Sequence, residues 1–267
     1  MITGTTRFAA VLGFPVEHSR SPALHNAGFA ALAFDAVMIP MAVAPAQLAL
    51  VVRALAAADC LGASVTTPHK HAVVALCDEL CPAAQKIGAV NCLQFIAGRI
   101  IGHNTDGDGF ADALRAAKIS WRGQRTLLLG GGGAACAVAY GVRDAGVVDV
   151  IARRPDAVAW AAAGPWTPAQ LRETFARADI IVDCTSTALH GEADEAALVD
   201  GLPLDALRPT AVVVSLTYHR DPLLLFRARA LGLATLNGRD MLLHQGLRAF
   251  SLWTGQAAPI AAMSAVL

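Results

Sequence analysis

The chain has 267 residues, with 21 lysines and arginines against 21 aspartates and glutamates, and its composition is 55% hydrophobic but only 16% charged. The balanced charge excludes a global electrostatic field that would attract nucleic acid or an anionic membrane, and the apolar composition excludes extended disorder. Because the length exceeds that of most single domains, we expect two domains separated by a cleft.

No segment resembles an uncharged membrane span of roughly 20 residues, because the most apolar stretches contain Arg53 and Asp59 or the glycines of 130–133. Residues 1–10 lack the basic region, apolar run and cleavage site of a secretory signal. The six cysteines form no CxxC pair and no cluster at zinc spacing; they are Cys60, Cys77, Cys81, Cys92, Cys136 and Cys184. We therefore expect a cytoplasmic protein with reduced thiols and no metal site.

The N-terminal part of the chain alternates short apolar runs with helical patterns. We predict strands at 8–13, 38–43 and 62–66, and helices at 22–33 and 45–58. Ser21 has the chemistry of an N-cap, and Pro22 suits the first turn of the helix that follows it. This alternation predicts a parallel α/β sheet.

After the loop 102–109 the pattern restarts. We predict helices at 110–117, from the glycine run to about 145, at 168–176 and at 223–230, and apolar strands at 126–129, 147–152, 180–184 and 212–216. Such strict alternation predicts a doubly wound nucleotide-binding domain at 106–239. A last helix at 240–253 is expected to return to the first domain, which would then comprise 1–105 completed by 240–267.

A glycine run follows a buried strand and precedes a helix, as Gly130, Gly131, Gly132, Gly133 and Ala134. Glycine allows a tight turn and the close approach of a pyrophosphate, while the helix start offers unpaired N–H groups and the positive end of the dipole. A flexible glycine turn is the alternative. The flanking strand and helix favour a dinucleotide site.

The strand at 147–152 runs into Arg153 and Arg154, where a dinucleotide site selects its cofactor. Guanidinium groups bind phosphate oxygens in a bidentate manner, which favours the 2′-phosphate of NADP. NAD stays an alternative because Asp149 and Asp156 lie close in sequence.

Four further segments place polar side chains at strand ends or turns. Ser19 and Ser21 can direct two hydroxyls at one carboxylate, and Lys70 follows the strand at 62–66. Asn91 and Asp106 offer an amide and a carboxylate at predicted turns. Taken singly, Ser21 is explained by capping, Lys70 as a solvated cation, and Asn91 and Asp106 by ordinary turn chemistry, whereas Ser19 is left unexplained.

Together and in this order, the segments resemble the shikimate dehydrogenase family. Its signatures are present as GxPxxHSxSPxxHN from Gly13, VTxPxK to Lys70, GAVN to Asn91, NTDG around Asp106, the glycine-rich LGxGGxx loop, and GxxMLxxQ to Gln245. The resemblance covers nearly the whole chain.

The resemblance implies an N-terminal substrate domain and a C-terminal NADP domain. The implied reaction is the reversible oxidation of shikimate at its C3 hydroxyl to 3-dehydroshikimate, in the biosynthetic route to aromatic amino acids. Carried over by motif, Ser19 and Ser21 hold the ring carboxylate, and the ring hydroxyls are bound by Thr66, Asn91 and Gln245. Lys70 and Asp106 form the catalytic pair, and which of them carries the transferred proton is left open.

Further positions match the family around the nicotinamide. Tyr218 corresponds to a tyrosine near the substrate carboxylate, Thr185 to a cofactor contact, and Gly238 and Met241 to residues that shape the nicotinamide pocket. Alternatively, Tyr218 is a residue at the boundary between core and surface, and Met241 is an ordinary core residue.

The chain departs from the family pattern near the site. Ser64 and Cys92 stand where the family commonly has asparagine and threonine, Asp183-Cys184 replaces Asn-Ala, and Ser215 replaces aspartate. These departures keep two alternatives open: a paralogue acting on quinate, aminoshikimate or a related hydroxy acid, with NADP or NAD, and a non-catalytic dinucleotide-binding regulator. We expect a small-molecule substrate, no nucleic-acid or membrane partner, and a monomer or homodimer.

Overall fold

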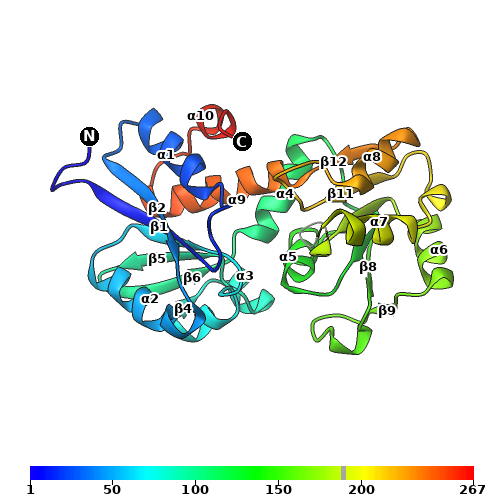
Figure 1. Ribbon diagram of the computed structural model, residues 1–267, viewed down its shortest axis with the longest axis horizontal. Coiled ribbons are helices and arrows are strands. Elements are labelled where there is room, and N and C mark those ends of the chain that lie inside the picture. The colour runs from blue at the N-terminus through cyan, green and yellow to red at the C-terminus, as the bar shows by residue number, and fades with distance from the viewer. Residues whose placement is uncertain (188–190) are drawn as a thin grey trace. The chain divides into compact units, whose positions relative to one another are not determined.

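The computed structural model describes residues 1–187 and 191–267. They form two compact units: Met1–Gly109 with Leu243–Leu267 as unit 1, and Phe110–Leu242 as unit 2. Both boundaries fall inside helices, namely α4 (Asp106–Ala116) and α9 (Gly238–Thr254) (Figure 1). Among the described residues, no helix combines the length and the apolar character needed to span a membrane.

Unit 1 is built on a mixed six-stranded sheet of order β2-β1-β3-β5-β6-β4. Its strands are β1 (Arg7–Gly13), β2 (Ala36–Ala42), β3 (Gly62–Val65), β4 (Glu79–Leu80), β5 (Cys92–Ile96) and β6 (Arg99–His103). β1 is parallel to β2 and β3, whereas β5 is antiparallel to β3 and β6. The predicted strands β1, β2 and β3 are parallel as expected, and the sheet is mixed because of β5, which joins β6 in a tight hairpin at Ala97 and Gly98, both at positive φ.

Helices cover both faces of the unit 1 sheet. They are α1 (Ser21–Ala31), α2 (Leu48–Ala57), α3 (Pro82–Ile87), α10 (Ile260–Ser264) and the C-terminal part of α9. Successive residues of a strand point to opposite faces, so Ala9 and Val11 of β1 join one core cluster while Ala10 and Leu12 join another. The first cluster includes Phe250 of α9, and the second includes residues of α2.

Unit 2 is built on a parallel six-stranded sheet of order β12-β11-β10-β7-β8-β9. Its strands are β7 (Arg125–Leu129), β8 (Val147–Ala152), β9 (Gly164–Pro165), β10 (Ile180–Asp183), β11 (Val212–Ser215) and β12 (Ala234–Leu236). Counted along the chain within this unit, the order is third, second, first, fourth, fifth, sixth, which is that of a dinucleotide-binding fold. The strand order reverses between β7 and β10, where such folds bind their ligand.

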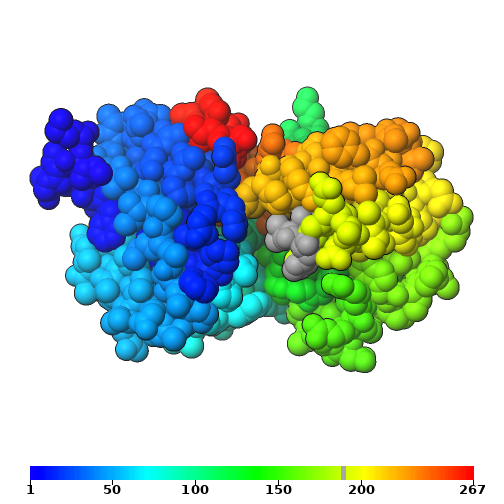
Figure 2. Space-filling view, viewed as in Figure 1, coloured from blue at the N-terminus to red at the C-terminus, as the bar shows by residue number. Residues whose placement is uncertain are grey.

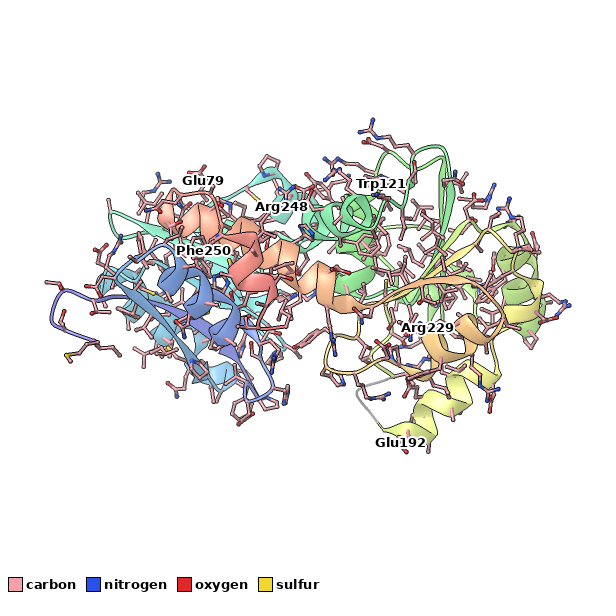
Figure 3. All side chains as sticks on the ribbon, turned by 90° about the horizontal axis from the view of Figure 1, so that it is seen from above. Glu79, Trp121, Glu192, Arg229, Arg248 and Phe250 are labelled. Atoms are coloured by element: carbon pink, nitrogen blue, oxygen red, sulfur yellow. The ribbon has the colours of Figure 1, made fainter. Side chains whose placement is uncertain are left out.

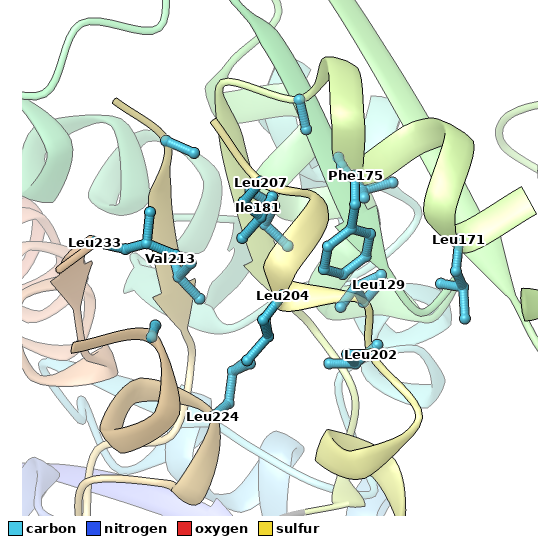
Figure 4. Packing of buried hydrophobic residues seen from close by; sticks show 14 of the residues in the cluster. Leu129, Leu171, Phe175, Ile181, Leu202, Leu204, Leu207, Val213, Leu224 and Leu233 are labelled. Atoms are coloured by element: carbon cyan, nitrogen blue, oxygen red, sulfur yellow. The ribbon is translucent and has the colours of Figure 1, made fainter. Parts of the chain in front are cut away.

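Helices also cover both faces of the unit 2 sheet. They are α5 (Gly133–Gly141), α6 (Pro168–Arg177), α7 (Glu192–Asp200), α8 (Leu223–Ala230) and most of α4. Figure 4 shows one face, where Leu129, Ile181 and Val213 of three strands pack with Phe175 of α6 and Leu224 of α8. Burial on both faces explains why these strands read as continuous apolar runs.

Several local predictions need correction. The helix predicted at 45–58 is a 3-10 turn, Pro45–Gln47, followed by α2, and the helix predicted to reach 145 ends at Gly141. The loop predicted at 102–109 is instead the end of β6 and the start of α4, so Asp106 is a helical residue. Other 3-10 turns lie at Ala72–Leu76, Pro155–Ala157 and Leu204–Ala206. In Figure 2 the N-terminal residues, in dark blue, project from the surface, and Met1 and Ile2 are exposed.

Candidate active site

Two charged side chains of unit 1 lie in direct contact. Lys70, in the turn after β3, donates a hydrogen bond from Nζ to Oδ2 of Asp106 across 2.6 Å. Asp106 is the first residue of α4, where the helix dipole favours a negative charge. The lysine side chain is 35% exposed and the aspartate 13%, so the ion pair is accessible from the lysine side.

A buried polar network holds the carboxylate of Asp106 in place. Asn91 Nδ2 donates to Asp106 Oδ1 at 2.8 Å and to Thr105 Oγ1 at 2.9 Å, and Asn91 Oδ1 accepts from the Thr105 N–H at 2.7 Å. Asn104 Oδ1 accepts from the Asp106 N–H at 3.1 Å, and its amide nitrogen donates to the Ala89 carbonyl at 3.0 Å. Such a satisfied buried network is rigid, so the carboxylate is fixed before any substrate binds.

The network extends to α9 through Gln245. Asn91 Nδ2 lies 3.4 Å from Gln245 Oε1. α9 and α4 approach closely at Gly109, where an added Cβ would stand 2.7 Å from the backbone nitrogen of Gln245. Arg248, labelled in Figure 3, pairs with Asp108 of α4 at 3.5 Å. A glycine at 109 is therefore required for Gln245 to reach the network.

The end of β3 places Thr66 and Lys70. An added Cβ at Gly13, at the end of β1, would lie 2.6 Å from Thr66 Cγ2, so only glycine allows Thr66 this position. The buried His69 bonds the Val43 carbonyl through Nε2 at 2.7 Å. These contacts fix the turn that carries the lysine.

Ser19 and Ser21 lie at the start of α1, and the prediction that Ser21 is its N-cap is wrong. Ser21 is the first helical residue rather than the N-cap, which is Arg20. Instead, Ser19 Oγ accepts the Ser21 N–H at 3.3 Å, while Pro22 occupies the first turn as predicted. Ser21 is buried and Ser19 partly exposed, and neither hydroxyl is needed as an N-cap of α1.

In unit 2 the glycine run between β7 and α5 has a backbone that larger residues would disrupt. Gly130 has φ +101°, a conformation that glycine favours. A Cβ on Gly131 would collide with Val158 Cγ2, and the Gly131 carbonyl accepts from Trp160 Nε1 at 2.9 Å. A Cβ on Gly132 would meet no atom within 4 Å. At Gly131 the loop is thus packed against Val158 and bonded to Trp160, whereas the space beside Gly132 is open.

The first turn of α5 has the character of an anion site. The helix begins at Gly133, and its N-cap, Gly132, provides no side chain to bond the amides of Gly133 and Ala134. Uncapped amides at a helix start combine with the helix dipole to bind phosphate groups. These residues therefore fit the pyrophosphate of a dinucleotide.

Arg153 and Arg154 are exposed directly after β8. β8 pairs in parallel with β7, with Ile151 opposite Leu129, so the carboxyl ends of both strands meet at one edge of the sheet. The two arginines therefore lie at the same edge as the glycine loop and fit an additional phosphate.

Thr185 lies in the turn after β10. Its Cγ2 would be 3.5 Å from a Cβ on Gly130. Its Oγ1 donates to Asp183 Oδ1 at 2.7 Å, and its N–H donates to the same oxygen at 3.0 Å. Thr185 therefore borders the glycine loop, while its hydroxyl is oriented by Asp183.

Tyr218, Gly238 and Met241 lie around the loop after β11 and the start of α9. A Cβ on Gly238 would collide with the Leu216 carbonyl oxygen, so glycine is required for this contact. Arg239 Nε donates to the Tyr218 carbonyl at 3.2 Å. Met241 packs partly buried against the unit 2 core. The loop that carries Tyr218 is thereby tied to the first turn of α9.

Four of the residues that depart from the family pattern lie opposite one another on adjacent strands. Ser64 of β3 stands opposite Cys92 of β5, and Asp183 of β10 stands opposite Ser215 of β11. Burial raises the pKa of Asp183 despite its hydrogen bonds from Thr185, and burial also raises the pKa of Cys92. Four of the five departures therefore form two pairs on neighbouring strands, and Cys184 stands outside these pairs.

Some residues of the site were not among those predicted. Asn104, Thr105 and His69 support the pair of Lys70 and Asp106 but were not identified from the sequence. Asn104 and Thr105 belong to the NTDG segment in which only Asp106 was singled out, and that segment was the available signal.

Comparisons with known proteins agree with this arrangement. Residues 11–93 match the family model of the shikimate dehydrogenase substrate binding domain, and 238–267 that of the shikimate 5′-dehydrogenase C-terminal domain. A shikimate dehydrogenase (NADP(+)) of Citrifermentans bemidjiense is 39% identical over all of this chain and 96% of its own. The chain thus has relatives matched over nearly their full length.

Two solved structures also resemble this chain over nearly its whole length. Shikimate 5-dehydrogenase from Thermus thermophilus, solved with NADP(H) and shikimate, superposes with a TM-score of 0.86 at 34% identity and covers 98% of both chains. Quinate dehydrogenase from Corynebacterium glutamicum, solved with NAD, has a TM-score of 0.85 at 27% identity over 98% of both chains.

The two units define a two-domain α/β protein with a Rossmann-type dinucleotide-binding domain, which confirms the predicted fold class. The chain belongs to the shikimate dehydrogenase family.

Proposed function

We propose that this chain catalyses the reversible, NADP-dependent oxidation of the C3 hydroxyl of shikimate to 3-dehydroshikimate. The observation that carries the proposal is the 2.6 Å contact between Lys70 and Asp106, oriented by Asn91. The full-length relatives that carry this name, and a solved neighbour with NADP(H) and shikimate bound, support it.

Lys70 and Asp106 are assigned to proton transfer. Hydride leaves the carbinol carbon only if the hydroxyl proton also departs, so a general base must stand beside that hydroxyl. Asp106 is held by Asn91 at one oxygen and by Lys70 at the other, which fixes the direction of the lysine Nζ. When bound, NADP supplies the nicotinamide that accepts the hydride.

The other polar residues of unit 1 are assigned to the substrate. Ser19 and Ser21 supply hydroxyls for the ring carboxylate, and the ring hydroxyls bond Thr66, Asn91 and Gln245. Tyr218 of unit 2 is assigned as a further substrate contact. The support for these roles is the polar network around Asp106 and the match of each position to the family motifs.

The cofactor is assigned to unit 2. The pyrophosphate would bond the amides of the glycine loop and the start of α5, at Gly130, Gly131, Gly132, Gly133 and Ala134. Arg153 and Arg154 would bind the 2′-phosphate of NADP. Thr185, Gly238 and Met241 would border the nicotinamide half. The open position at Gly132 and the uncapped first turn of α5 support this assignment.

Two alternatives are less well supported. A paralogue acting on quinate, aminoshikimate or a related acid, with NADP or NAD, would keep the same proton-transfer pair, but the full-length relatives are named shikimate dehydrogenase (NADP(+)). A non-catalytic dinucleotide-binding regulator would have no use for the Lys70–Asp106 pair.

We also infer a cytoplasmic location and an assembly of one or two chains. All six cysteines are free thiols, as is usual in a reducing compartment. The balance of 21 basic and 21 acidic residues gives no reason to expect a nucleic-acid partner.

The test is a substrate and cofactor matrix. Shikimate and quinate are each offered with NADP and with NAD, and reduced nicotinamide is followed by absorbance. We expect the highest kcat/KM for shikimate with NADP. A preference for quinate or for NAD would replace the substrate or cofactor assignment, and cofactor binding without turnover of either acid would favour the regulator.

A further inference from the structure

The connection between β8 and β9 differs from the usual crossover of a parallel sheet (Figure 1). Parallel strands are ordinarily joined through an α-helix, but residues 153–163, all of which the structure describes, contain the 3-10 turn Pro155–Ala157 and no α-helix. Trp160, Ala161 and Ala163 pack against the same core cluster as residues of α5. The indole of Trp160 is therefore brought to the face of the sheet on which α5 lies.

Trp160 and Val158 contact the glycine loop directly. Trp160 Nε1 donates to the Gly131 carbonyl at 2.9 Å, and Val158 fills the space that a Cβ on Gly131 would need. The connection is also tied to the carboxyl end of β8, because the Ala157 N–H donates to the Arg154 carbonyl at 3.1 Å. The segment that begins with the two arginines thus holds one peptide group of the loop.

The hydrogen bond from Trp160 determines the direction of the next amide. The Gly131–Gly132 peptide is trans, and in a planar trans peptide the carbonyl and the following N–H point in opposite directions. The Gly132 N–H is therefore directed away from Trp160. Gly132 has φ −79°, near the helical value, so its N–H lies on the same side as a Cβ would, as in a helix. Since a Cβ there would meet no atom within 4 Å, the side to which this N–H points is open.

This peptide group needs an external partner to keep its orientation. It lies between two glycines, whose backbone angles are less restricted than those of any other residue. Rotation of the peptide would exchange the directions of its carbonyl and its N–H, and a carbonyl oxygen would then face the pyrophosphate and repel it. The hydrogen bond from Trp160 stabilises the orientation that presents the N–H.

We propose that Trp160 is a positioning residue for the dinucleotide: by holding the Gly131 carbonyl, it presents the Gly132 N–H to the pyrophosphate before the cofactor binds. This inference rests on the proposed function, in which the glycine loop binds the pyrophosphate. Because NADP and NAD share the pyrophosphate and differ at the ribose 2′ position, the binding of both should depend on Trp160 to the same degree.

Two variants remove the hydrogen bond and keep an aromatic ring. Trp160→Phe lacks the indole N–H but can still pack against the core. Replacement of Trp160 by benzothienylalanine, in which sulfur stands in place of the indole N–H, keeps the shape of the side chain and tests the bond even if phenylalanine packs poorly. Trp166→Phe is the matched control, because Trp166 is also partly buried in unit 2 but packs against the core cluster on the other face of the sheet.

The experiment measures dissociation constants by calorimetry for NADPH, NADH and adenosine 2′-monophosphate, which carries the 2′-phosphate but no pyrophosphate. With either Trp160 variant we expect binding of NADPH and of NADH to weaken by about 10-fold, the effect of losing about one hydrogen bond. Adenosine 2′-monophosphate should bind as it does to the wild type.

Steady-state kinetics separates this role from a merely structural one. In the Trp160 variants the KM for NADP should rise by about 10-fold, whereas kcat, the KM for shikimate and the thermal unfolding midpoint should stay close to those of Trp166→Phe. A residue that only filled the core would change the unfolding midpoint without a selective loss of cofactor affinity.

Wild-type affinities for NADPH and NADH in both Trp160 variants would overturn the proposal. An equal loss of affinity for adenosine 2′-monophosphate would also overturn it, because the effect would then pass through Arg153 and Arg154 rather than the pyrophosphate. If the wild type binds neither dinucleotide, the proposed function fails and this inference fails with it. If the wild type binds NADPH and the variants bind it equally well, only this inference fails.

Discussion

His25 of α1 stacks on Phe250 of α9 with ring centroids 6.2 Å apart and an interplanar angle of 13°. Figure 3 shows α9, labelled at Phe250, beside α1. His25 is fully buried, and neither ring nitrogen has a hydrogen-bond partner among the described residues. Burial lowers the pKa of His25 to about 3, so the ring is held neutral in the folded state.

This burial makes the stability of unit 1 depend on pH. The unfolded chain binds a proton at His25 below about pH 6.5, and the folded chain does not until about pH 3. The free energy of unfolding should therefore fall by roughly 1.4 kcal/mol per pH unit as the pH decreases across this window. His25→Leu introduces an apolar side chain of similar size that cannot bind a proton. It should remove this difference in the free energy of unfolding between pH 7 and pH 5, measured by urea unfolding. The exposed control His18→Gln should leave it in place, and an unchanged slope in His25→Leu would refute the account.

Asp183 should make the stability of the protein depend on pH in the direction opposite to that of His25. Because burial raises its pKa, the folded state holds a proton that the unfolded state has released, and stability from this group is lost as pH rises toward the folded pKa. Asp183→Asn keeps the acceptor for Thr185 and removes the charge, so its melting temperature should exceed that of the wild type at pH 8 and approach it at pH 4. The exposed control Asp59→Asn should show no such difference. A lower melting temperature for Asp183→Asn at pH 8 would contradict the prediction.

Arg153 and Arg154 should discriminate between the two nicotinamide cofactors. Replacing either by alanine should remove the proposed charge-assisted hydrogen bonds to the 2′-phosphate, each worth about 1.5–3 kcal/mol. The affinity for NADPH in a fluorescence titration should fall by about 10- to 100-fold, while that for NADH stays the same. The exposed control Arg53→Ala should change neither. Equal losses of affinity for NADPH and NADH would show that the arginines do not bind the 2′-phosphate.

Asp106→Asn tests the proposed role of Asp106 in orienting Lys70. The amide can still accept from Asn91, but its NH₂ group would face the donor Nζ of Lys70, so the ion pair is lost. We expect kcat to fall by about 10²- to 10⁴-fold with NADPH affinity unchanged. Asp108→Asn in the same helical turn, which breaks the 3.5 Å pair with Arg248, should lower kcat by much less. Similar kcat values for the two variants would contradict the role of Asp106.

The sequence predicted the regular parts of unit 2 well. β8 and α8 have the predicted bounds, because an apolar run interrupted at Asp149 alone and a helical repeat that follows Pro222 need no distant partner to be recognised. By contrast, α7 was not predicted. Its buried Glu195 is stabilised by Arg220 at 2.6 Å and by the Leu223 N–H at 2.6 Å, and these contacts are remote in sequence.

The site was only partly accessible from the sequence. Lys70 and Asp106 could be paired only through the family resemblance, since neither segment by itself, nor the spacing between them, shows that the two side chains meet. That Ser21 is a helical residue rather than the N-cap follows from where α1 begins. The network of Asn104 and Thr105 depends on the start of α4 at Asp106, which places residues of a predicted loop in buried positions.

The most direct test of the central claim compares Lys70→Ala with the wild type and with Lys86→Ala, an exposed lysine in the last turn of α3. Each protein is assayed for shikimate oxidation with NADP and titrated with NADPH. We predict that Lys70→Ala lowers kcat by at least about 10²-fold with NADPH affinity and thermal unfolding unchanged, and that Lys86→Ala resembles the wild type. A Lys70→Ala enzyme that turns over shikimate within a few-fold of the wild type would contradict the account.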